Sequence, residues 1–322
     1  FRVVGIEPVE GTTGNPEPDT RPILALTRRC FAELDASSDL EELIDCATEC
    51  IERHFGIRHS ILLLTESGGS TLYAVGSRGY AASGAGAEIA LGEGVIGVAA
   101  REATPIRISY FTREYSYGAA ISGAALRAGI LAEAGRCIPL PGLARPQSQI
   151  ALPILSEGRV QGVLFAESET PMAFGHAEED ALSLVASHFG ARMCALRQTL
   201  VDELQDEPPL PQTATRRVVL RFVRFDQSVF LDNDYLIKGV AGAILWRLLQ
   251  IHRETGRTEF SLRELRVDPE LRLPTLSENL DARLILLRRR LLERGGGIQI
   301  QKSGRGRVRL DLECLLSFEE TD

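Results

Sequence analysis

The most regular pattern of apolar and polar positions lies near the end of the chain, from Ser277 to Arg294. Four leucines follow one another there at steps of four, three and four residues: Leu280, Leu284, Leu287 and Leu291. This spacing predicts a helix with one buried face. Glycines at 295–297 end the helix, and alternating residues from 297 to 313 predict a two-stranded hairpin with a Ser-Gly-Arg-Gly tip.

Apolar spacing also predicts the elements of the first half. Helices are expected over residues 23–36 and 38–55, the second with Ser38 as its N-cap. Strands are expected at 59–67 and 71–80, and a short helix runs from Val95 to Arg101 before a strand that begins at Pro105. An Ala/Gly-rich portion at 119–134 predicts a further helix, and residues 148–168 predict two strands joined around Glu157 and Gly158.

A long helix is expected over residues 176–205, because its apolar positions recur at heptad-like spacing. These positions are Leu182, Val185, Phe189, Met193, Leu196 and Leu200. Such a stripe invites a second helix, and we therefore expect a homodimer that forms through it. The acidic, proline-rich segment 206–215 follows, and it has too few apolar side chains to form a core.

These patterns divide the chain of 322 residues into an N-terminal extension (1–22), a first domain that includes the expected dimer helix (23–205), a linker (206–215), a second domain (216–316) and a tail (317–322). Helices and antiparallel strands occur in both domains, which places the fold in the α+β class. A hydrophobic content of 44% is enough for two ordinary cores.

Charge is distributed unequally between the two domains. Residues 216–313 contain 20 Lys and Arg against 13 Asp and Glu, a net charge of about +7, and the whole chain carries −8, so the rest carries about −15. A basic domain attached to an acidic one suits binding to nucleic acid, since phosphate neutralisation supplies much of the affinity.

Several other classes of protein are disfavoured by the sequence. No apolar run approaches the roughly 20 residues of a membrane span, and no signal peptide is visible, so we expect a cytoplasmic protein without membrane contact. The chain lacks GxSxG, HExxH and GxxxxGK[ST] motifs, which predicts a protein that is not an enzyme. No histidine has ligand spacing.

Three cysteines allow two interpretations. Cys46 and Cys50 are one helical turn apart, so their sulfurs can meet, and Cys30 lies on the preceding helix. Thiolates at this spacing can bind a soft metal or a cluster. Cys50, however, shares the apolar stripe of its helix, where a small buried residue is expected. We therefore expect no metal and no cofactor of certain identity.

Residues 40–200 resemble a GAF domain. The segments that carry the resemblance are Leu91-Gly-Glu-Gly-Val-Ile-Gly97 and Gly162-Val-Leu-Phe-Ala166, in the order helix, two strands, the glycine-containing segment, a variable stretch, a hairpin and a long helix. The resemblance implies an α/β sensory module that holds a small molecule against its sheet or dimerises. The residues expected for cyclic-nucleotide binding and the Cys-His pair for bilin attachment are absent.

The variable stretch from Tyr110 to Gln147 would cover the sheet where GAF ligands bind, and its aromatic residues can form an apolar pocket or a small core of their own. The candidate pocket residues are Tyr73, Ile96, Ile108, Tyr110, Phe111, Tyr115, Tyr117 and Cys137. The ligand is an unidentified small-molecule effector.

Residues 218–312 resemble the winged-helix DNA-binding domain of OmpR/PhoB-type response regulators. Strands at 218–239, a helix at 242–256, a short helix at 261–267, then the leucine-striped helix and the basic hairpin follow in the order of that family. The sequence departs from the family at Ile285 and Leu286, which lie off the leucine face where polar or basic residues are usual. Either they contact thymine methyl groups, or the helix packs on a protein.

The resemblance implies double-stranded DNA as a partner, read by side chains away from the leucine face and by the wing. The candidate residues are Asn279, Arg283, Arg289, Arg290, Lys302, Arg305 and Arg307. The alternative is a solvated, arginine-rich helix end. DNA binding requires that this helix and the hairpin present one exposed cationic surface.

Together these features predict a transcription regulator in which a GAF domain controls a winged-helix output domain. One alternative is a signalling module that uses its winged helix for protein contacts and binds no DNA. A minor alternative is a GAF-type methionine sulfoxide reductase, which needs more cysteines in the pocket wall than Cys137.

Overall fold

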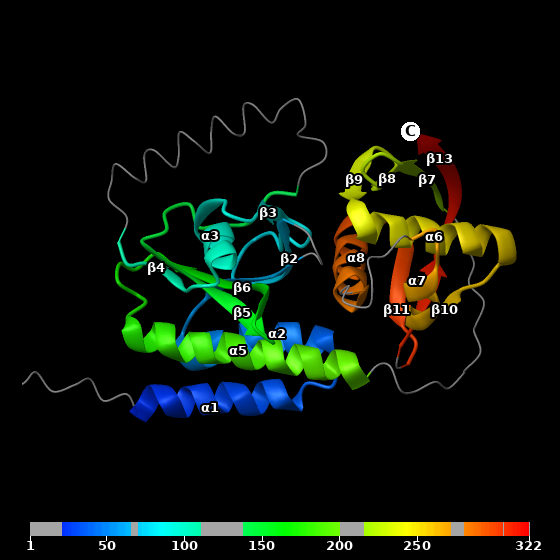
Figure 1. Ribbon diagram of the computed structural model, residues 1–322. Coiled ribbons are helices and arrows are strands. Elements are labelled where there is room, and N and C mark those ends of the chain that lie inside the picture. Colours follow the sequence, from blue (N-terminus) through cyan, green and yellow to red (C-terminus); the bar gives the residue numbers. More distant parts are fainter. Residues whose placement is uncertain are drawn as a thin grey trace, which may run out of the picture.

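The computed structural model describes residues 21–65, 70–110, 138–199, 216–271, 280–304 and 306–321. Two modules lie side by side, an N-terminal module (described residues 21–199) and a C-terminal module (described residues 216–321) (Figure 1). No helix of the described residues is both long enough and apolar enough to cross a membrane.

The N-terminal module is built on one antiparallel sheet with the strand order β3-β2-β1-β6-β5-β4. Its strands are β1 (His59–Thr65), β2 (Thr71–Arg78), β3 (Glu88–Ala90), β4 (Ile106–Ile108), β5 (Ser148–Ser156) and β6 (Arg159–Ser168). The central strands are almost completely buried, which means that both faces of the sheet are covered.

Helices cover these two faces unequally (Figure 1). On one face lie α1 (Arg21–Ala36), α2 (Leu40–Phe55) and α5 (His176–Thr199), whose side chains join those of Leu62, Leu64 and Tyr73 in a large core. On the other face α3 (Gly94–Glu102) packs against Ile61 and Leu63. Successive residues of one strand thus serve two different cores.

The C-terminal module contains two small sheets and three described helices. Its strands are β7 (Arg216–Val223), β8 (Ser228–Leu231), β9 (Asp234–Ile237), β10 (Glu259–Ser261), β11 (Ile298–Lys302), β12 (Arg307–Leu312) and β13 (Cys314–Thr321). They form sheets of order β13-β7-β8-β9 and β10-β12-β11. The helices are α6 (Gly239–Thr255), α7 (Leu262–Val267) and α8 (Leu280–Arg294).

Most expected elements are present. Asp39, not Ser38, is the N-cap of α2, because its carboxylate accepts from the backbone N–H of Glu42 while Ser38 donates to the Glu42 side chain. Within the expected tail 317–322, residues 317–321 instead continue β13, which pairs in parallel with β7. The expected helix at 119–134 lies outside the described residues.

The apolar stripe of α5 packs against other elements of the same chain. Leu182, Val185, Phe189 and Met193 are at most 1% exposed, in the core that α5 shares with the sheet and α1. Leu196 packs partly buried on the same core, and the side chain of Leu200 lies outside the described residues. The periodicity that suggested a dimer helix is therefore explained by packing inside the module, and a homodimer needs another surface.

Candidate functional site

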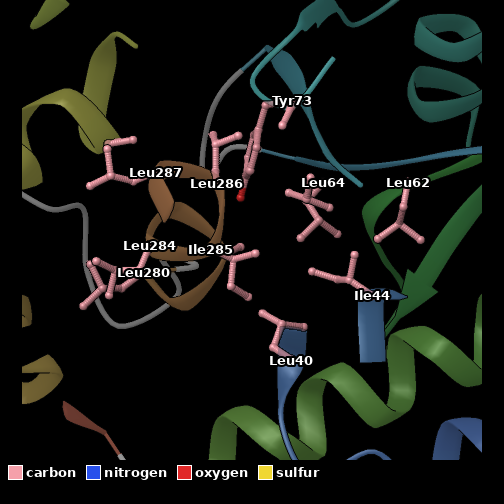
Figure 2. Packing of buried hydrophobic residues seen from close by; sticks show 14 of the residues in the cluster. Leu40, Ile44, Leu62, Leu64, Tyr73, Leu280, Leu284, Ile285, Leu286 and Leu287 are labelled. Carbon is pink, nitrogen blue, oxygen red and sulfur yellow. The ribbon is translucent and has the colours of Figure 1, made fainter. Parts of the chain in front are cut away.

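Helix α8 of the C-terminal module packs against α2 and β2 of the N-terminal module. Its leucine face (Leu280, Leu284, Leu287 and Leu291) is buried, and Figure 2 shows Leu280, Leu284 and Leu287 pointing away from the N-terminal module. On the other side Ile285 and Leu286 point toward Leu40, Leu64 and Tyr73 (Figure 2). Ile285 is only 6% exposed and Leu286 only 2%. The two residues that depart from the family pattern thus pack on protein.

Arg283 lies in the same contact. Its guanidinium sits over the ring of Tyr73 on β2, with Cζ 3.8 Å from the ring centroid, and the side chain is almost completely buried. Burial of a cation is costly, and the electron-rich face of an aromatic ring offsets part of that cost. Arg283 was expected to face DNA, and in this conformation it is enclosed between the two modules.

Carboxylates of the N-terminal module hold the neighbouring cations. Arg288 donates to Glu41 at 2.5 Å, and Arg289 donates to Asp45 at 2.7 Å, both acids being on α2. Lys302, at the end of β11, is 2.6 Å from Asp39. These pairs form a row along the first half of α2, which we call the acidic edge (Asp39, Glu41 and Asp45).

The backbone of β2 completes the contact. Arg289 also donates to the carbonyl oxygen of Val75 at 2.7 Å. Gly76 makes this approach possible, because a Cβ there would lie 3.1 Å from the guanidinium of Arg289 and 2.8 Å from Ile44. A second hydrogen bond joins Ser83 to Glu293 across the modules.

Within the acidic edge, the surroundings of Asp39 favour its ionised form. Burial opposes its ionisation, but hydrogen bonds from Lys302 and from the backbone of Glu42, with the charge of Lys302, outweigh that effect. The pKa of the Asp39 carboxyl therefore lies below its usual value, so Asp39 stays an anion beside Lys302 at neutral pH.

The remaining candidate DNA residues are distributed differently. Arg290 is buried, donates to the carbonyl oxygen of Leu236 and pairs with Glu293. Arg307 is half-buried on β12 and lines a narrow cleft with Arg288 and Lys302. Asn279 and Arg305 lie outside the described residues. Four of the seven, Arg283, Arg289, Arg290 and Lys302, are thus engaged with protein, and their role toward DNA stays a prediction.

A cavity of about 860 Å³ lies on the opposite face of the N-terminal sheet, beside α3. Ile96, one of the candidate pocket residues, lines it together with Ile89, Leu140 and Phe165. Tyr73 does not, because its side chain leaves β2 on the α2 face, while its neighbours Leu72 and Ala74 point to the α3 face. This placement corrects the expectation that Tyr73 belongs to the pocket.

The other expected pocket residues do not line this cavity within the described chain. Ile108 is half-buried on β4, and Tyr110 is 62% exposed. Phe111, Tyr115, Tyr117 and Cys137 lie outside the described residues.

A buried carboxylate in the cavity wall was missed by sequence reasoning. Glu167 of β6 is 3% exposed and accepts hydrogen bonds from Tyr80 at 3.0 Å, from the backbone N–H of Leu143 at 2.6 Å and from Gln149 at 3.1 Å. Burial, and then the charge of Glu167, raise the pKa of the Tyr80 phenol, which stays a donor. The sequence offered one signal for this buried carboxylate, because Glu167 directly follows the apolar run Gly162–Ala166.

The three cysteines of α1 and α2 belong to or pack against the same large core. Cys30 and Cys50 are completely buried, and Cys46 is partly accessible. Among the residues that the structure describes, no group of three or more His, Cys, Asp or Glu side chains is arranged to hold a metal ion.

Comparisons with known proteins concern the N-terminal module. The family model described as GAF domain matches residues 37–193. No curated protein matches the chain. Several solved structures are similar at low identity. The GAF domain of an Acinetobacter phosphoenolpyruvate-protein phosphotransferase is 16% identical, with 54% of this chain and 94% of that chain covered and a TM-score of 0.42.

Two further structures give similar values. The corresponding GAF domain from Coxiella burnetii is 16% identical, with 56% and 98% of the chains covered and a TM-score of 0.42. A free methionine-R-sulfoxide reductase from Neisseria meningitidis is 18% identical, with 55% and 91% covered and a TM-score of 0.42. On the strength of the family match, residues 37–193 of this chain are a GAF domain.

Proposed function

We propose that this protein is a signal-responsive regulator in which the GAF domain controls a winged-helix, DNA-binding module by covering helix α8. The observation that supports this proposal most directly is the acidic edge. Three cations of α8 and β11 are paired with carboxylates of the GAF domain, in the way that phosphates of a duplex would pair with them. In this conformation the GAF domain occupies the surface that DNA would need.

The organisation of the C-terminal module supports the winged-helix part of the proposal. A leading sheet is followed by α6, α7 and α8, and the hairpin β11–β12 comes directly after α8. The hairpin shares a sheet with β10, the strand that precedes α7. In a winged helix the last helix enters the major groove and the hairpin lies beside it, and α8 and β11 are neighbours here.

The cavity beside α3 is the proposed place of the signal, because it adjoins the contact between the modules. Glu88 lines the cavity and is 2.9 Å from Lys238 of the C-terminal module. Ile138 lines it as well and packs against Val223, Phe230 and Tyr235. An effector that shifts these two residues would weaken the contact. To change a 99% closed population into a 99% open one, the effector must bind the open form more tightly than the closed form by about 5.5 kcal/mol.

A second candidate function follows from the burial of Ile285 and Leu286. If the contact never opens, α8 is a permanent structural joint and the protein is a signalling module without DNA binding. The mixed character of the contact favours the first function. The Asp45 side chain, for example, stays 59% exposed in its pair with Arg289, and pairs with a solvent-exposed partner contribute little to stability.

The test reverses charges of the GAF domain without changing the candidate DNA residues. The variant Glu41→Lys/Asp45→Lys removes two pairs and places cations opposite cations. Binding to a fluorescein-labelled duplex of mixed sequence is measured by anisotropy. We expect at least a roughly tenfold gain in affinity, which corresponds to about 1.4 kcal/mol released from the closed form. The affinity of the variant should fall steeply between about 50 and 200 mM salt.

A matched control separates opening from simple attraction. Glu169→Lys/Asp180→Lys changes the net charge equally at exposed positions of the GAF domain, away from α8. An equal gain in this control would contradict gating. If no variant binds the duplex, the DNA-binding function is rejected and the signalling module stands.

A further inference from the structure

The loop between β2 and β3 (residues 79–87, the β2–β3 loop) lies against both the cavity wall and α8. Its second half is buried, since Ala85 and Ala87 are each only 1% exposed. The two alanines belong to different cores: Ala85 to the large core that includes the leucines of α8, and Ala87 to the smaller core of α3. A loop packed into both cores links them mechanically, because close-packed interiors transmit displacement.

One end of the β2–β3 loop is anchored in the cavity wall. The Tyr80 hydroxyl donates to Oε1 of Glu167 at 3.0 Å, and the same oxygen accepts from the backbone N–H of Leu143 at 2.6 Å. Leu143 ends a run of cavity-lining residues, 138–143, which we call the proline segment. A single carboxylate oxygen therefore ties the loop to the proline segment.

Two glycines of the loop touch the proline segment. A Cβ on Gly84 would overlap the ring of Pro141, and a Cβ on Gly86 would lie 2.8 Å from Cδ1 of Ile138. The same Cβ on Gly86 would lie 3.5 Å from Cδ1 of Leu286. Gly86 is thus the position at which a residue of the cavity wall and a residue of α8 meet the same stretch of backbone.

The tip of the loop contacts α8 a second time. The Ser83 hydroxyl donates to the carboxylate of Glu293. The loop is also fastened to β2, because the Ser77 hydroxyl donates to the Ser83 carbonyl oxygen at 2.5 Å and the Gly86 backbone N–H donates to the carbonyl oxygen of Ala74 at 2.9 Å. These bonds hold the loop in one defined shape, so a displacement of its backbone reaches α8.

We propose that the β2–β3 loop transmits the occupancy of the cavity to α8. A molecule that fills the cavity pushes the proline segment outward, Ile138 then presses on Gly86, and Gly86 presses on Leu286. Tyr80 is a positioning residue: it anchors the loop at Glu167, so that the loop moves α8 and does not give way. This role of the loop rests on the proposed function, in which the cavity receives the effector and α8 is released.

The test fills the cavity by mutation, so that no effector has to be known. Val95 lines the cavity from α3 and is half-buried, and Val95→Trp adds a large ring there. Hydroxyl-radical footprinting with mass spectrometry measures solvent access to Leu286, whose labelling should rise at least about fivefold. Leu287 is the internal control: it is completely buried, points away from the GAF domain (Figure 2) and should stay protected.

Two second substitutions separate the loop from the other link between the cavity and the C-terminal module. Tyr80→Phe removes only the hydroxyl that donates to Glu167 and should abolish most of the rise at Leu286. Lys238→Met removes the ion pair with Glu88 and should leave the rise in place. If Lys238→Met abolishes the rise and Tyr80→Phe does not, the loop proposal is overturned while the proposed function stands.

Folding of the filled variant is monitored by the same footprint. If Leu287 is labelled together with Leu286, Val95→Trp has unfolded the module, and Leu140→Trp, which adds the ring from the proline segment, replaces it. The proposal is also overturned if neither tryptophan exposes Leu286. The charge-reversal variant of the acidic edge leaves the cavity unchanged, so it tests separately whether the GAF domain covers α8.

Discussion

The two sides of helix α8 are both largely buried but differently composed. The side that faces its own module consists of leucines, and the side that faces the GAF domain combines Ile285 and Leu286 with arginines that meet carboxylates and an aromatic ring. An all-leucine face cannot leave its core without exposing apolar surface to water. The mixed face carries charges that water, phosphate or carboxylate can each satisfy. The leucine face is therefore a contact that the folded module requires, whereas the mixed face is a contact that can open.

The largest effect should come from breaking the leucine side. Leu287 is completely buried, and Leu287→Ala should lower the free energy of unfolding of the C-terminal module by about 2–5 kcal/mol through lost burial and a cavity. Urea unfolding followed by the fluorescence of Trp246 measures it. Leu292→Ala, on the same helix and 69% exposed, should change it by less than about 0.5 kcal/mol. Equal effects at both positions would contradict the assignment of the two sides.

Breaking the mixed side should open the protein without unfolding it. Leu286→Ala removes a side chain that is 2% exposed, and about 2 kcal/mol of contact energy should be lost from the closed form. The open fraction then rises roughly 30-fold. Small-angle scattering should show a larger radius of gyration, with an unchanged circular dichroism spectrum. A variant that loses helix content instead would show that Leu286 belongs to the folding core.

A double-mutant cycle sharpens the comparison at Arg283 and Tyr73. The coupling energy between Arg283→Ala and Tyr73→Leu should be about 0.5–2 kcal/mol, since the ion and the ring are desolvated together. The matched cycle uses Arg257 and Phe260, a pair inside the C-terminal module with a longer separation of 5.1 Å and a half-exposed arginine. Its coupling should be smaller. A coupling energy near zero for Arg283 and Tyr73 would show that cation–π attraction does not stabilise the contact.

The smallest effect concerns pH. The pKa of Asp39 is lower in the folded protein than in the unfolded chain, where it is about 3.9, so its contribution is present above that value and lost as the pH falls through the folded pKa. Because the Lys302 side chain is 42% exposed, this contribution should be under about 1 kcal/mol. Asp39→Asn should flatten the stability curve below about pH 4. An unchanged curve would assign the acid sensitivity to other carboxylates.

The sequence was informative wherever a contact is local or periodic. Leucines at helical spacing predicted α8, and alternation with a glycine-containing tip predicted β11 and β12. β13 was missed because its pairing with β7 joins residues about a hundred positions apart, as Cys314 with Arg216. No periodicity within a segment reports such a partner.

The candidate site was predicted only in part, for the same reason. Ile285 and Leu286 marked α8 as unusual, but the residues that they point toward, on α2, β1 and β2, are more than 200 positions earlier in the chain. Tyr73 was assigned to the wrong face because β2 is buried on both faces, so alternation does not distinguish one face from the other. Glu167 was missed because burial, which makes this carboxylate informative, cannot be seen in a sequence.

The order of the two modules has a consequence for synthesis. The acidic edge precedes α8 by more than 200 residues, and the ribosome adds about 5–20 residues per second with N-terminal domains folding first. About 80 residues separate the end of α5 from the start of α8, so several seconds are available for the GAF domain to fold before the arginines are translated. Helix α8 is thus translated after the GAF domain that packs on it. The nascent chain therefore has little opportunity to adhere to nucleic acid near the ribosome.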